Sequence, residues 1–540
     1  RARAHLPTPR PLDSMRRTPT LPAPSSVPVA ARETAASARD RPREGFVSCD
    51  PSPERHARAV GSSTLETHAR RARKALVVAL LLARAPTAAA KKLLLTSDSA
   101  SCALDDAGVM KCWGGNEHGQ LGNGQSGQTA YEFTPSVVGI NGVDVFNGKD
   151  LEHIAGGWLH HCALEREQSG GTKVWCWGYN GYGQVGDGTT TLRTDPVLVK
   201  LGDANGPALT GVSSLVLGWD ITCAAMSAGG VMCWGRNEAN LGYACGDGTT
   251  GHKSNPVWVK MSDYSDLQGV VRELYVGQFH SCVLFEDDLD RLVCWGMQTW
   301  GIANPDVDPA TTTNDGMARF MAKEITYFKD RGKRVKSLGL GSDHTCALLT
   351  TGTVECWGVN DYGQLGVNCG VNSYTPAQVP GLSGVASIDG GNRFTCVIIS
   401  FTGEVKCWGN NALNQLGSGF PDNYYGSEAS EASAYCGVTS SVRTSSVANI
   451  GTNGNPGARV LAVSWYHTCA TMSDFTIRCW GNNPRGQLGD HQTEARTEPV
   501  TVLLSTGSPG VNFIAFDTRG ACGCCDDMMK ARGFHTDCKA

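Results

Sequence analysis

The sequence lacks the compact motifs from which a catalytic activity can be read. Its 540 residues contain no phosphate-binding loop, no Gly-x-Ser-x-Gly nucleophile elbow and no His-Glu-x-x-His zinc motif. Paired acids such as Asp287 and Asp288 are typical of turns or a solvated surface. We therefore expect a protein that is not an enzyme, with no catalytic residue, no cofactor and no bound metal.

Long hydrophobic runs and glycosylation sequons are missing as well. No stretch is apolar over the length that a helix needs to span a bilayer, so we expect no stable membrane span. The absence of Asn-x-Ser/Thr weakens the case for passage through a glycosylating compartment. The cysteines, described below, argue in the opposite direction.

The first 90 residues differ in composition from the rest. Residues 1–69 hold ten of the 24 prolines and almost no periodic apolar pattern, which predicts a disordered basic extension. Residues 70–90 combine a basic start, the short apolar run Ala75–Ala83 and an Ala-rich end, which are the three parts of a secretory signal. An Ala-rich basic linker is the alternative interpretation.

Charge separates the same two regions. Residues 1–92 carry a net charge of +11, and residues 93–540 carry −15. An acidic body repels phosphate, so we expect no nucleic acid as a partner of the main part of the chain. The basic extension could still engage chromatin or a membrane surface.

One motif recurs along the chain and is clearest at Gly341–Gly366. Two strand-like segments, 345–348 and 354–357, contain Cys346 and Cys356, with a turn between them and a Gly/Asn-rich loop after Trp357. Seven copies occur, with second cysteines 51 to 72 residues apart, which leaves room for about four short strands per copy. The paired cysteines are Cys102/Cys112, Cys162/Cys176, Cys223/Cys233, Cys282/Cys294, Cys346/Cys356, Cys396/Cys407 and Cys469/Cys479.

A repeat of this length has the size of a propeller blade. We therefore predict an all-β, seven-bladed propeller over residues 93–525, followed by a cysteine-containing tail at 526–540. A partial eighth copy at 511–522 matches the strand that leads into each first cysteine. We expect it to close the ring by supplying a strand that the first blade, weak at Leu93–Ser101, lacks.

The pattern Gly-x-x-His-x-Cys-Ala-Leu, then Cys-Trp-Gly-x-Asn-x-x-Gly-Gln-Leu-Gly, resembles the regulator-of-chromosome-condensation (RCC1-like) repeat in a cysteine-rich variant. The resemblance covers most of the ordered chain and implies that family's seven-bladed β-propeller. Members include an exchange factor for the GTPase Ran, ubiquitin-ligase recognition domains, a plant UV-B receptor and secreted binders. The fold therefore does not fix the function.

The cysteine spacing bears on the cellular compartment. Four copies separate their cysteines by nine residues around a central turn, which places them opposite each other across a hairpin. Opposed residues can form a disulfide if the backbone adjusts, so all fourteen are disulfide candidates in an oxidising compartment. Two buried apolar side chains are the alternative, and the ten-residue gap of Cys396/Cys407 is the least regular.

Cysteines outside the repeat pair cannot be assigned from spacing. Their crowding in the tail favours disulfides over a zinc site, without indicating the connectivity. They include Cys245, Cys369, Cys436, Cys522, Cys524, Cys525 and Cys538.

Large rings that recur once per blade predict a core between blades. They belong to Trp113, Trp177, Trp234, Trp295, Trp357, Trp408 and Trp480. Histidines recur two residues before the first cysteine in four copies, at His160, His280, His344 and His467. Because a blade repeat distributes them around a ring, we predict structural histidines rather than ligands of one metal ion.

Departures from the repeat are where an individual function is expected. The fourth copy loses the Gly-Gln-Leu-Gly loop and has Trp300 there, and the insertion Ser418–Gly457 in the sixth contains Tyr424 and Tyr425. Aromatic residues in such loops suit protein recognition, so these three are candidate partner-binding residues. A solvated insertion is the alternative.

Two members of the resembling family can be compared motif by motif. The UV-B receptor type uses Gly-Trp-Arg-His-Thr, whereas Trp158, Trp219 and Trp465 here lack the following Arg, so we do not expect light sensing. The Ran exchange factor shares the blade number and a basic tail, but no stretch here matches its GTPase-inserting wedge.

The favoured hypothesis is a non-enzymatic, monomeric propeller scaffold, secreted or lumenal and disulfide-stabilised, that binds a protein partner through its loops. The alternative is a guanine-nucleotide exchange factor or regulator of a small GTPase in the cytoplasm or nucleus. Its basic N-terminal tail would then engage chromatin or membrane. A glycan-binding lectin is a third, less specific possibility.

Overall fold

The computed structural model describes residues 94–105, 108–140, 143–238, 245–261, 265–287, 291–297, 301–306, 318–367, 370–419 and 445–503. The expected extension at 1–69, the signal-like segment at 70–90, the partial repeat at 511–522 and the tail at 526–540 lie outside these ranges. Within them, the chain forms no helix with the length and apolar character needed to cross a bilayer.

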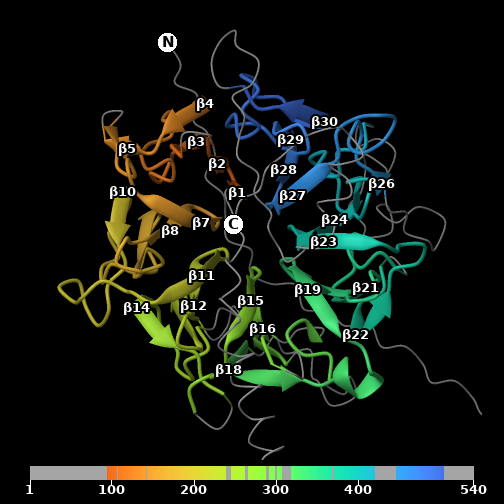
Figure 1. Ribbon diagram of the computed structural model, residues 1–540, viewed down its shortest axis with the longest axis horizontal. Helices are drawn as coiled ribbons and strands as arrows, with labels where there is room; N and C mark the ends of the chain where they lie inside the picture. Colours follow the sequence, from red (N-terminus) through yellow and green to blue (C-terminus); the bar gives the residue numbers. More distant parts are fainter. Residues whose placement is uncertain are drawn as a thin grey trace, which may run out of the picture. The chain divides into compact units, whose positions relative to one another are not determined.

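The described chain folds into seven four-stranded antiparallel sheets that stand as blades around a central axis (Figure 1). The innermost strands are β1 (Leu94–Thr96), β7 (Asp150–Gly156), β11 (Val212–Leu217), β15 (Val271–Val276), β19 (Val335–Leu340), β23 (Val385–Gly390) and β27 (Ala458–Val463). The second strands are β2 (Ala100–Leu104), β8 (His160–Arg166), β12 (Ile221–Met226), β16 (His280–Phe285), β20 (His344–Leu349), β24 (Phe394–Ile399) and β28 (His467–Met472).

The third and fourth strands complete each blade toward its outer edge. The third strands are β3 (Met110–Gly114), β9 (Thr172–Gly178), β13 (Val231–Gly235), β17 (Leu292–Met297), β21 (Val354–Gly358), β25 (Val405–Gly409) and β29 (Ile477–Gly481). The outermost are β4 (Glu132–Val137), β10 (Arg193–Leu198), β14 (Lys253–Trp258), β18 (Ala318–Ile325), β22 (Ser373–Gln378), β26 (Ser445–Ser446) and β30 (Arg496–Thr501). A two-stranded ribbon, β5 (Gly139–Ile140) with β6 (Val143–Asp144), and the 3-10 turn Lys329–Arg331 lie in connections between blades. The all-β, seven-bladed propeller expected from the repeat is confirmed.

Antiparallel pairing gives the ring two different faces. The turn between the first and second strands and the loop between the third and fourth strands emerge at the same end of a blade. We call this end the loop face. The tight turn between the second and third strands emerges at the other end, which we call the hairpin face.

The two cysteines of every repeat are direct cross-strand partners. Cys102 lies opposite Cys112, for example, with their Cα atoms 4.1 Å apart and their sulfurs bonded. The structure forms the same disulfide at Cys162–Cys176, Cys223–Cys233, Cys282–Cys294, Cys346–Cys356, Cys396–Cys407 and Cys469–Cys479. Each closes a short loop already held by a hairpin, so each stabilises at the low end of roughly 0–5 kcal/mol.

The irregular pair Cys396–Cys407 keeps the same register as the others. Its extra residue is absorbed by the turn, where Phe401 adopts a φ of 67° and leaves its side chain exposed. The strand ladder on both sides is therefore undisturbed, and spacing alone does not disqualify the pair.

Ring closure differs from the sequence-based expectation. The first blade takes all four of its strands, β1 to β4, from its own repeat, so it needs no strand from the end of the chain. Instead, side chains close the ring: Leu94 and Trp113 of the first blade share a buried cluster with Leu488 and Val502 of the last. The expectation that the first blade lacks a strand was wrong, because the three residues Leu94–Thr96 are enough for a short inner strand.

Tryptophans of the Cys-Trp-Gly motif join neighbouring blades. All seven are fully buried, and Trp234, for example, packs among residues of the preceding blade such as Leu164 and Val174. In five junctions the indole N–H donates to the backbone carbonyl of a glutamine in the loop of the preceding blade, at 2.9–3.0 Å. These pairs are Trp113–Gln487, Trp177–Gln120, Trp234–Gln184, Trp408–Gln364 and Trp480–Gln415.

Histidines form a second bridge between blades. The imidazole Nε2 lies 2.7–2.9 Å from a hydroxyl of the next blade in the pairs His160–Thr222, His280–Thr345, His344–Thr395 and His467–Ser101. Each hydroxyl also donates to a loop carbonyl, as Thr222 does to Gln184 at 2.9 Å, so Nε2 must carry the hydrogen. Each of the four histidines therefore serves a different junction.

Where the sixth blade has Phe394 in place of this histidine, the facing hydroxyl loses its partner. Thr468 Oγ1 is buried and accepts no hydrogen bond from the described residues. The two junctions therefore offer a matched comparison: the same threonine with and without its histidine.

We expect Thr222→Val to lower the free energy of unfolding by about 1–3 kcal/mol, because it leaves His160 and the Gln184 carbonyl without their shared hydroxyl. Thr468→Val should be neutral or slightly stabilising, because it removes a buried hydroxyl that has no partner. Urea unfolding of both variants beside the parent protein would measure this, and equal losses in the two would contradict it.

Candidate functional site

Three aromatic residues were proposed above as candidates for partner binding. Trp300, Tyr424 and Tyr425 all lie outside the described residues. The fourth-blade loop that contains Trp300 is described from Gly301, and there it keeps the geometry of the other loops: Thr345 donates to the Ile302 carbonyl at 2.8 Å, as Thr222 does to Gln184. The motif is lost in sequence but its backbone role is retained.

Cys245 also proves to be a structural residue. It is buried without a disulfide, and burial raises the pKa of its thiol. Its backbone N–H donates to the Asn237 side chain at 2.7 Å, as Val185 does to Asn180 at 2.9 Å. Cys245 thus fills the apolar position of the loop, and the disulfide considered for it from sequence is not formed.

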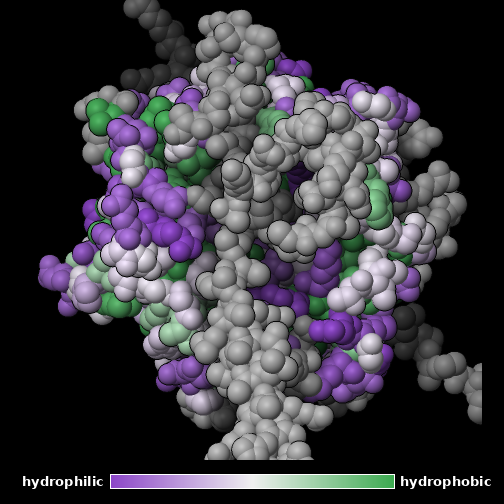
Figure 2. Space-filling view, viewed as in Figure 1, coloured by the Kyte–Doolittle hydropathy of each residue, from purple (hydrophilic) through white to green (hydrophobic). Residues whose placement is uncertain are grey.

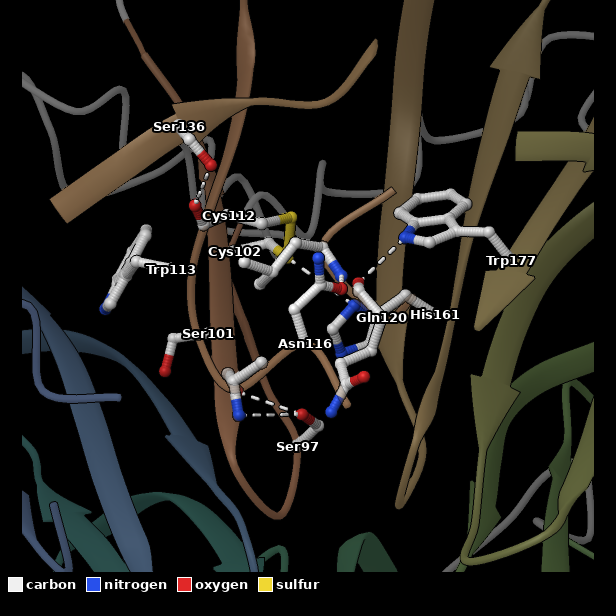
Figure 3. Close-up of a disulfide and its surroundings, with 12 residues drawn as sticks. Ser97, Ser101, Cys102, Cys112, Trp113, Asn116, Gln120, Ser136, His161 and Trp177 are labelled. Atoms are coloured by element: carbon white, nitrogen blue, oxygen red, sulfur yellow. Dashed lines mark hydrogen bonds between the residues drawn. A yellow bond between two sulfur atoms is a disulfide. The ribbon is translucent and has the colours of Figure 1, made fainter. Parts of the chain in front are cut away.

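The first junction places a histidine beside a disulfide. Figure 3 shows His161 reaching from the second blade toward Cys102 and Cys112, with its Nδ1 3.6 Å from the Cys102 sulfur. These three residues are spaced as metal ligands would be, but both sulfurs are bonded to each other and are not thiolates. His161 occupies the position that Thr or Ser takes in the other blades, opposite Ala100.

Partly exposed aromatic rings meet over the central axis at the loop face. Trp158, Trp219 and Trp465 occupy the same position in the turn after the inner strand of blades two, three and seven. The ring centroids of Trp158 and Trp219 are 4.9 Å apart, and those of Trp219 and Trp465 are 4.7 Å apart. Because blades three and seven are not neighbours, Trp219 and Trp465 must reach each other across the channel mouth.

We call Trp158, Trp219, Trp465 and Tyr466 the tryptophan plug. Tyr466 lies 6.1 Å from Trp465, and Phe279 of the fourth blade lies 6.3 Å from Trp219. Next to the plug is a cavity of about 80 Å³, lined by the same turn of every blade, including Gly157, Gln278 and Asn392. The plug is the feature that sequence reasoning missed, although the shared repeat position of the three tryptophans was a usable signal.

Arginine–carboxylate pairs surround the plug on the same face. Arg485 pairs with Glu117, Arg393 lies 3.4 Å from Asp343, and Arg236 lies 3.4 Å from Asp220. The first two pairs join loops of neighbouring blades, whereas Arg236 and Asp220 join two loops of the third blade. They also place planar guanidinium groups at the surface, which is common in protein interfaces.

A second aromatic strip continues outward over the first three blades. His118 contacts Tyr179 at 5.2 Å, Tyr179 contacts Tyr182 at 6.0 Å, and Tyr182 contacts His252 at 4.8 Å between ring centroids. The Arg236 guanidinium lies over the Tyr182 ring at 4.6 Å. In the view of Figure 2, the surface over the blade of β7 to β10 is largely polar.

Comparison with known proteins agrees with this geometry. The pattern described as "Regulator of chromosome condensation (RCC1) repeat" matches residues 173–225 and 351–398, and a second pattern of that description matches 335–364 and 460–487. The protein is a propeller of RCC1 repeats. The matched stretches include the buried Trp177, Trp357 and Trp480 and the junction histidines His344 and His467.

Relatives of this RCC1-repeat protein have diverse functions. The ultraviolet-B receptor UVR8 of Arabidopsis thaliana is 24% identical over 78% of this chain and 85% of its own length. The secretion-regulating guanine nucleotide exchange factor of Bos taurus is 32% identical, over 29% of this chain and 33% of its own. The solved structure of Prp20p from Saccharomyces cerevisiae superposes with a TM-score of 0.55 at 18% identity, covering 76% and 87% of the two chains, which shows the fold alone.

Burial shifts the ionisation of the junction histidines and of two carboxyls at the loop face. It lowers the pKa of His160, His280, His344 and His467 to about 3 and that of His161 to about 4. It raises the pKa of Asp98 and Asp220 to about 6. The imidazoles are therefore neutral in the folded protein at pH 7.

We expect the RCC1 propeller to lose stability as the pH falls below about 6.5. Between that pH and about 3 the five imidazoles bind protons in the unfolded chain but not in the folded one, so acid favours unfolding. Asp98 and Asp220 act in the opposite direction, since the folded protein protonates them near pH 6, but they are fewer. A lower midpoint of thermal unfolding at pH 5 than at pH 7.5 would agree with this prediction. A higher midpoint at pH 5 would contradict the neutral state assigned to the buried histidines.

Proposed function

We propose that this protein is a non-enzymatic scaffold, secreted or lumenal, that binds a protein partner through its loop face. The observation that carries the proposal is the tryptophan plug, in which half-buried aromatic side chains from separate blades converge at one place on the surface. Disulfides in all seven blades support an oxidising environment for the proposed scaffold.

The residue types at this face support recognition. Trp, Tyr and Arg are enriched among residues that contribute most to binding, especially where they are held rigidly near the centre of an interface. The turns that carry Trp158 and Trp219 are tied together, since the backbone N–H of Trp158 donates to the backbone carbonyl of Trp219 at 3.0 Å. A preorganised aromatic surface loses little conformational entropy on binding, which favours affinity.

A guanine-nucleotide exchange factor or regulator of a small GTPase is the second candidate, with the basic N-terminal tail engaging chromatin or membrane. It is favoured by the 32% identity to the secretion-regulating exchange factor, although this similarity covers a third of that protein. The propeller fold itself does not separate the two candidates.

We expect the double variant Tyr182→Ala/Trp465→Ala to recover its main protein partner at least tenfold less well than the parent. Truncating residues that contribute most to binding costs about 2 kcal/mol or more each. The matched control is Phe401→Ser, which changes an exposed aromatic residue on the hairpin face. The measurement is quantitative affinity capture from the native source.

Loss of the partner in the control, with retention in the loop-face variant, would contradict the proposed face. Faster release of GDP from a small GTPase in the presence of the parent protein would establish the second candidate instead.

For the compartment, we expect the protein from its natural source to have the fourteen repeat cysteines blocked to alkylation until it is reduced. Cys245 should react only after unfolding, because its thiol is buried and its pKa is raised. Mass spectrometry of the alkylated protein, with and without prior reduction, measures how many cysteines are blocked. Fourteen free thiols in the repeats would contradict the secreted or lumenal location.

A further inference from the structure

The carboxylate of Asp98, at the loop face, lies beside aromatic rings and forms no ion pair with a described cation. Asp98 follows β1 in the turn to β2, and the Trp158 indole donates a hydrogen bond to its side chain. Its backbone N–H donates to the Trp158 carbonyl at 3.3 Å. Asp98 also acts electrostatically on Tyr466, so it lies near two members of the tryptophan plug.

The charges around the plug do not balance. Each of the three arginines described above already has a carboxylate partner, and Arg236 is shared between Asp220 and Glu238. Asp98 has no ion-pair partner among the described residues. Glu117 and Arg485 act on it in opposite senses, and burial outweighs both, raising its pKa to about 6.

Aromatic faces next to this carboxylate are suited to a positive charge. A guanidinium or ammonium group is attracted to the face of an indole within about 6 Å of the ring centroid, and most strongly where it is partly desolvated. This face already uses the interaction internally, with Arg393 over Tyr362 at 4.9 Å and Arg236 over Tyr182 at 4.6 Å. No described cation lies over Trp158 or Trp465.

We propose that the tryptophan plug is the binding site for a basic side chain, arginine or lysine, of the partner protein, which pairs with the Asp98 carboxylate and lies against Trp158, Trp465 and Tyr466. This inference rests on the proposed binding function of the loop face and specifies its chemistry. Net charge agrees with it, because residues 93–540 carry −15. A single inserted cation would satisfy both the unpaired carboxylate and the exposed aromatic faces.

The pairing has a consequence for pH. A cation binds the ionised form of Asp98, so affinity should decrease as the pH falls through about 6, where the free protein protonates this group. The other charged or titratable groups acting on Asp98 are Glu117, Arg485 and Tyr466. Glu117 is paired with Arg485, and burial raises the pKa of Tyr466 above its ordinary value, so Asp98 is the member of this set that changes charge between pH 7 and 5. Asp220, next to Trp219, also has a pKa raised to about 6, but its carboxylate is paired with Arg236.

The test uses the full-length, disulfide-intact chain and a hexa-arginine peptide as the probe, titrated by isothermal calorimetry at physiological salt. We expect Asp98→Asn to weaken binding tenfold or more, Trp465→Ala to weaken it similarly, and Trp465→Phe to retain most of it. Asp474→Asn on the hairpin face is the control, because it removes the same single charge far from the plug. Thermal unfolding of each variant confirms that it is folded.

Equal weakening by Asp98→Asn and Asp474→Asn would overturn the proposal, since it would show attraction to net charge only. Absence of peptide binding to the parent protein would overturn it as well. If the partner-capture experiment succeeds while the peptide fails to bind, the loop face stands as the interface and only the cation site falls. Specific peptide binding without a captured partner would retain the cation site and remove support for the proposed scaffold.

Discussion

The structure depends on the burial of one indole ring between each pair of neighbouring blades. The ring fills the space between two sheets, and in five junctions its N–H also satisfies the carbonyl of a loop glutamine. Removing a buried ring of this size costs about 3–5 kcal/mol, more than any other single contact of the repeat is worth. The same hydrogen bond holds the glutamine loop in place. The packing of the indole in the core therefore also fixes the geometry of the loop face.

This coupling explains why the loop face can carry a rigid aromatic surface. The turns bearing Trp158, Trp219 and Trp465 follow inner strands whose blades are fixed by the junctions, and the rings then meet over the axis. Salt bridges such as Arg393–Asp343 tie adjacent loops together around them. The hairpin face has no comparable convergence among its described residues, and its exposed Phe401 stands at the tip of a turn.

The repeat allowed much of the fold to be predicted. Regular spacing implied the blades, and the symmetric position of Cys346 and Cys356 about a turn implied that they face each other, as they do. The first blade and the fourth loop were misread for a common reason. A motif is recognised by its side chains. The short inner strand at Leu94–Thr96 and the Ile302 carbonyl that accepts from Thr345 are made by the backbone, so neither depends on the motif residues.

The tryptophan plug was beyond motif reasoning for a different reason. Trp219 and Trp465 lie on blades that do not touch, so no local pattern relates them, and their contact depends on the diameter of the ring. Their equal repeat position shows that both point toward the axis, but not that they meet. Asp98 belongs to the part of the chain with the weakest match to the repeat, and only the folded ring brings it beside Trp158.

Each blade takes its four strands from one continuous stretch of chain, the first blade included. Each blade is therefore a separate unit of the chain. The chain could begin at any junction between blades without dividing a sheet. A circularly permuted gene that joins the last blade to the first and opens elsewhere would encode the same set of sheets. Duplication or loss of a whole repeat during evolution would likewise add or remove a complete blade, leaving only the fit of the ring to be adjusted.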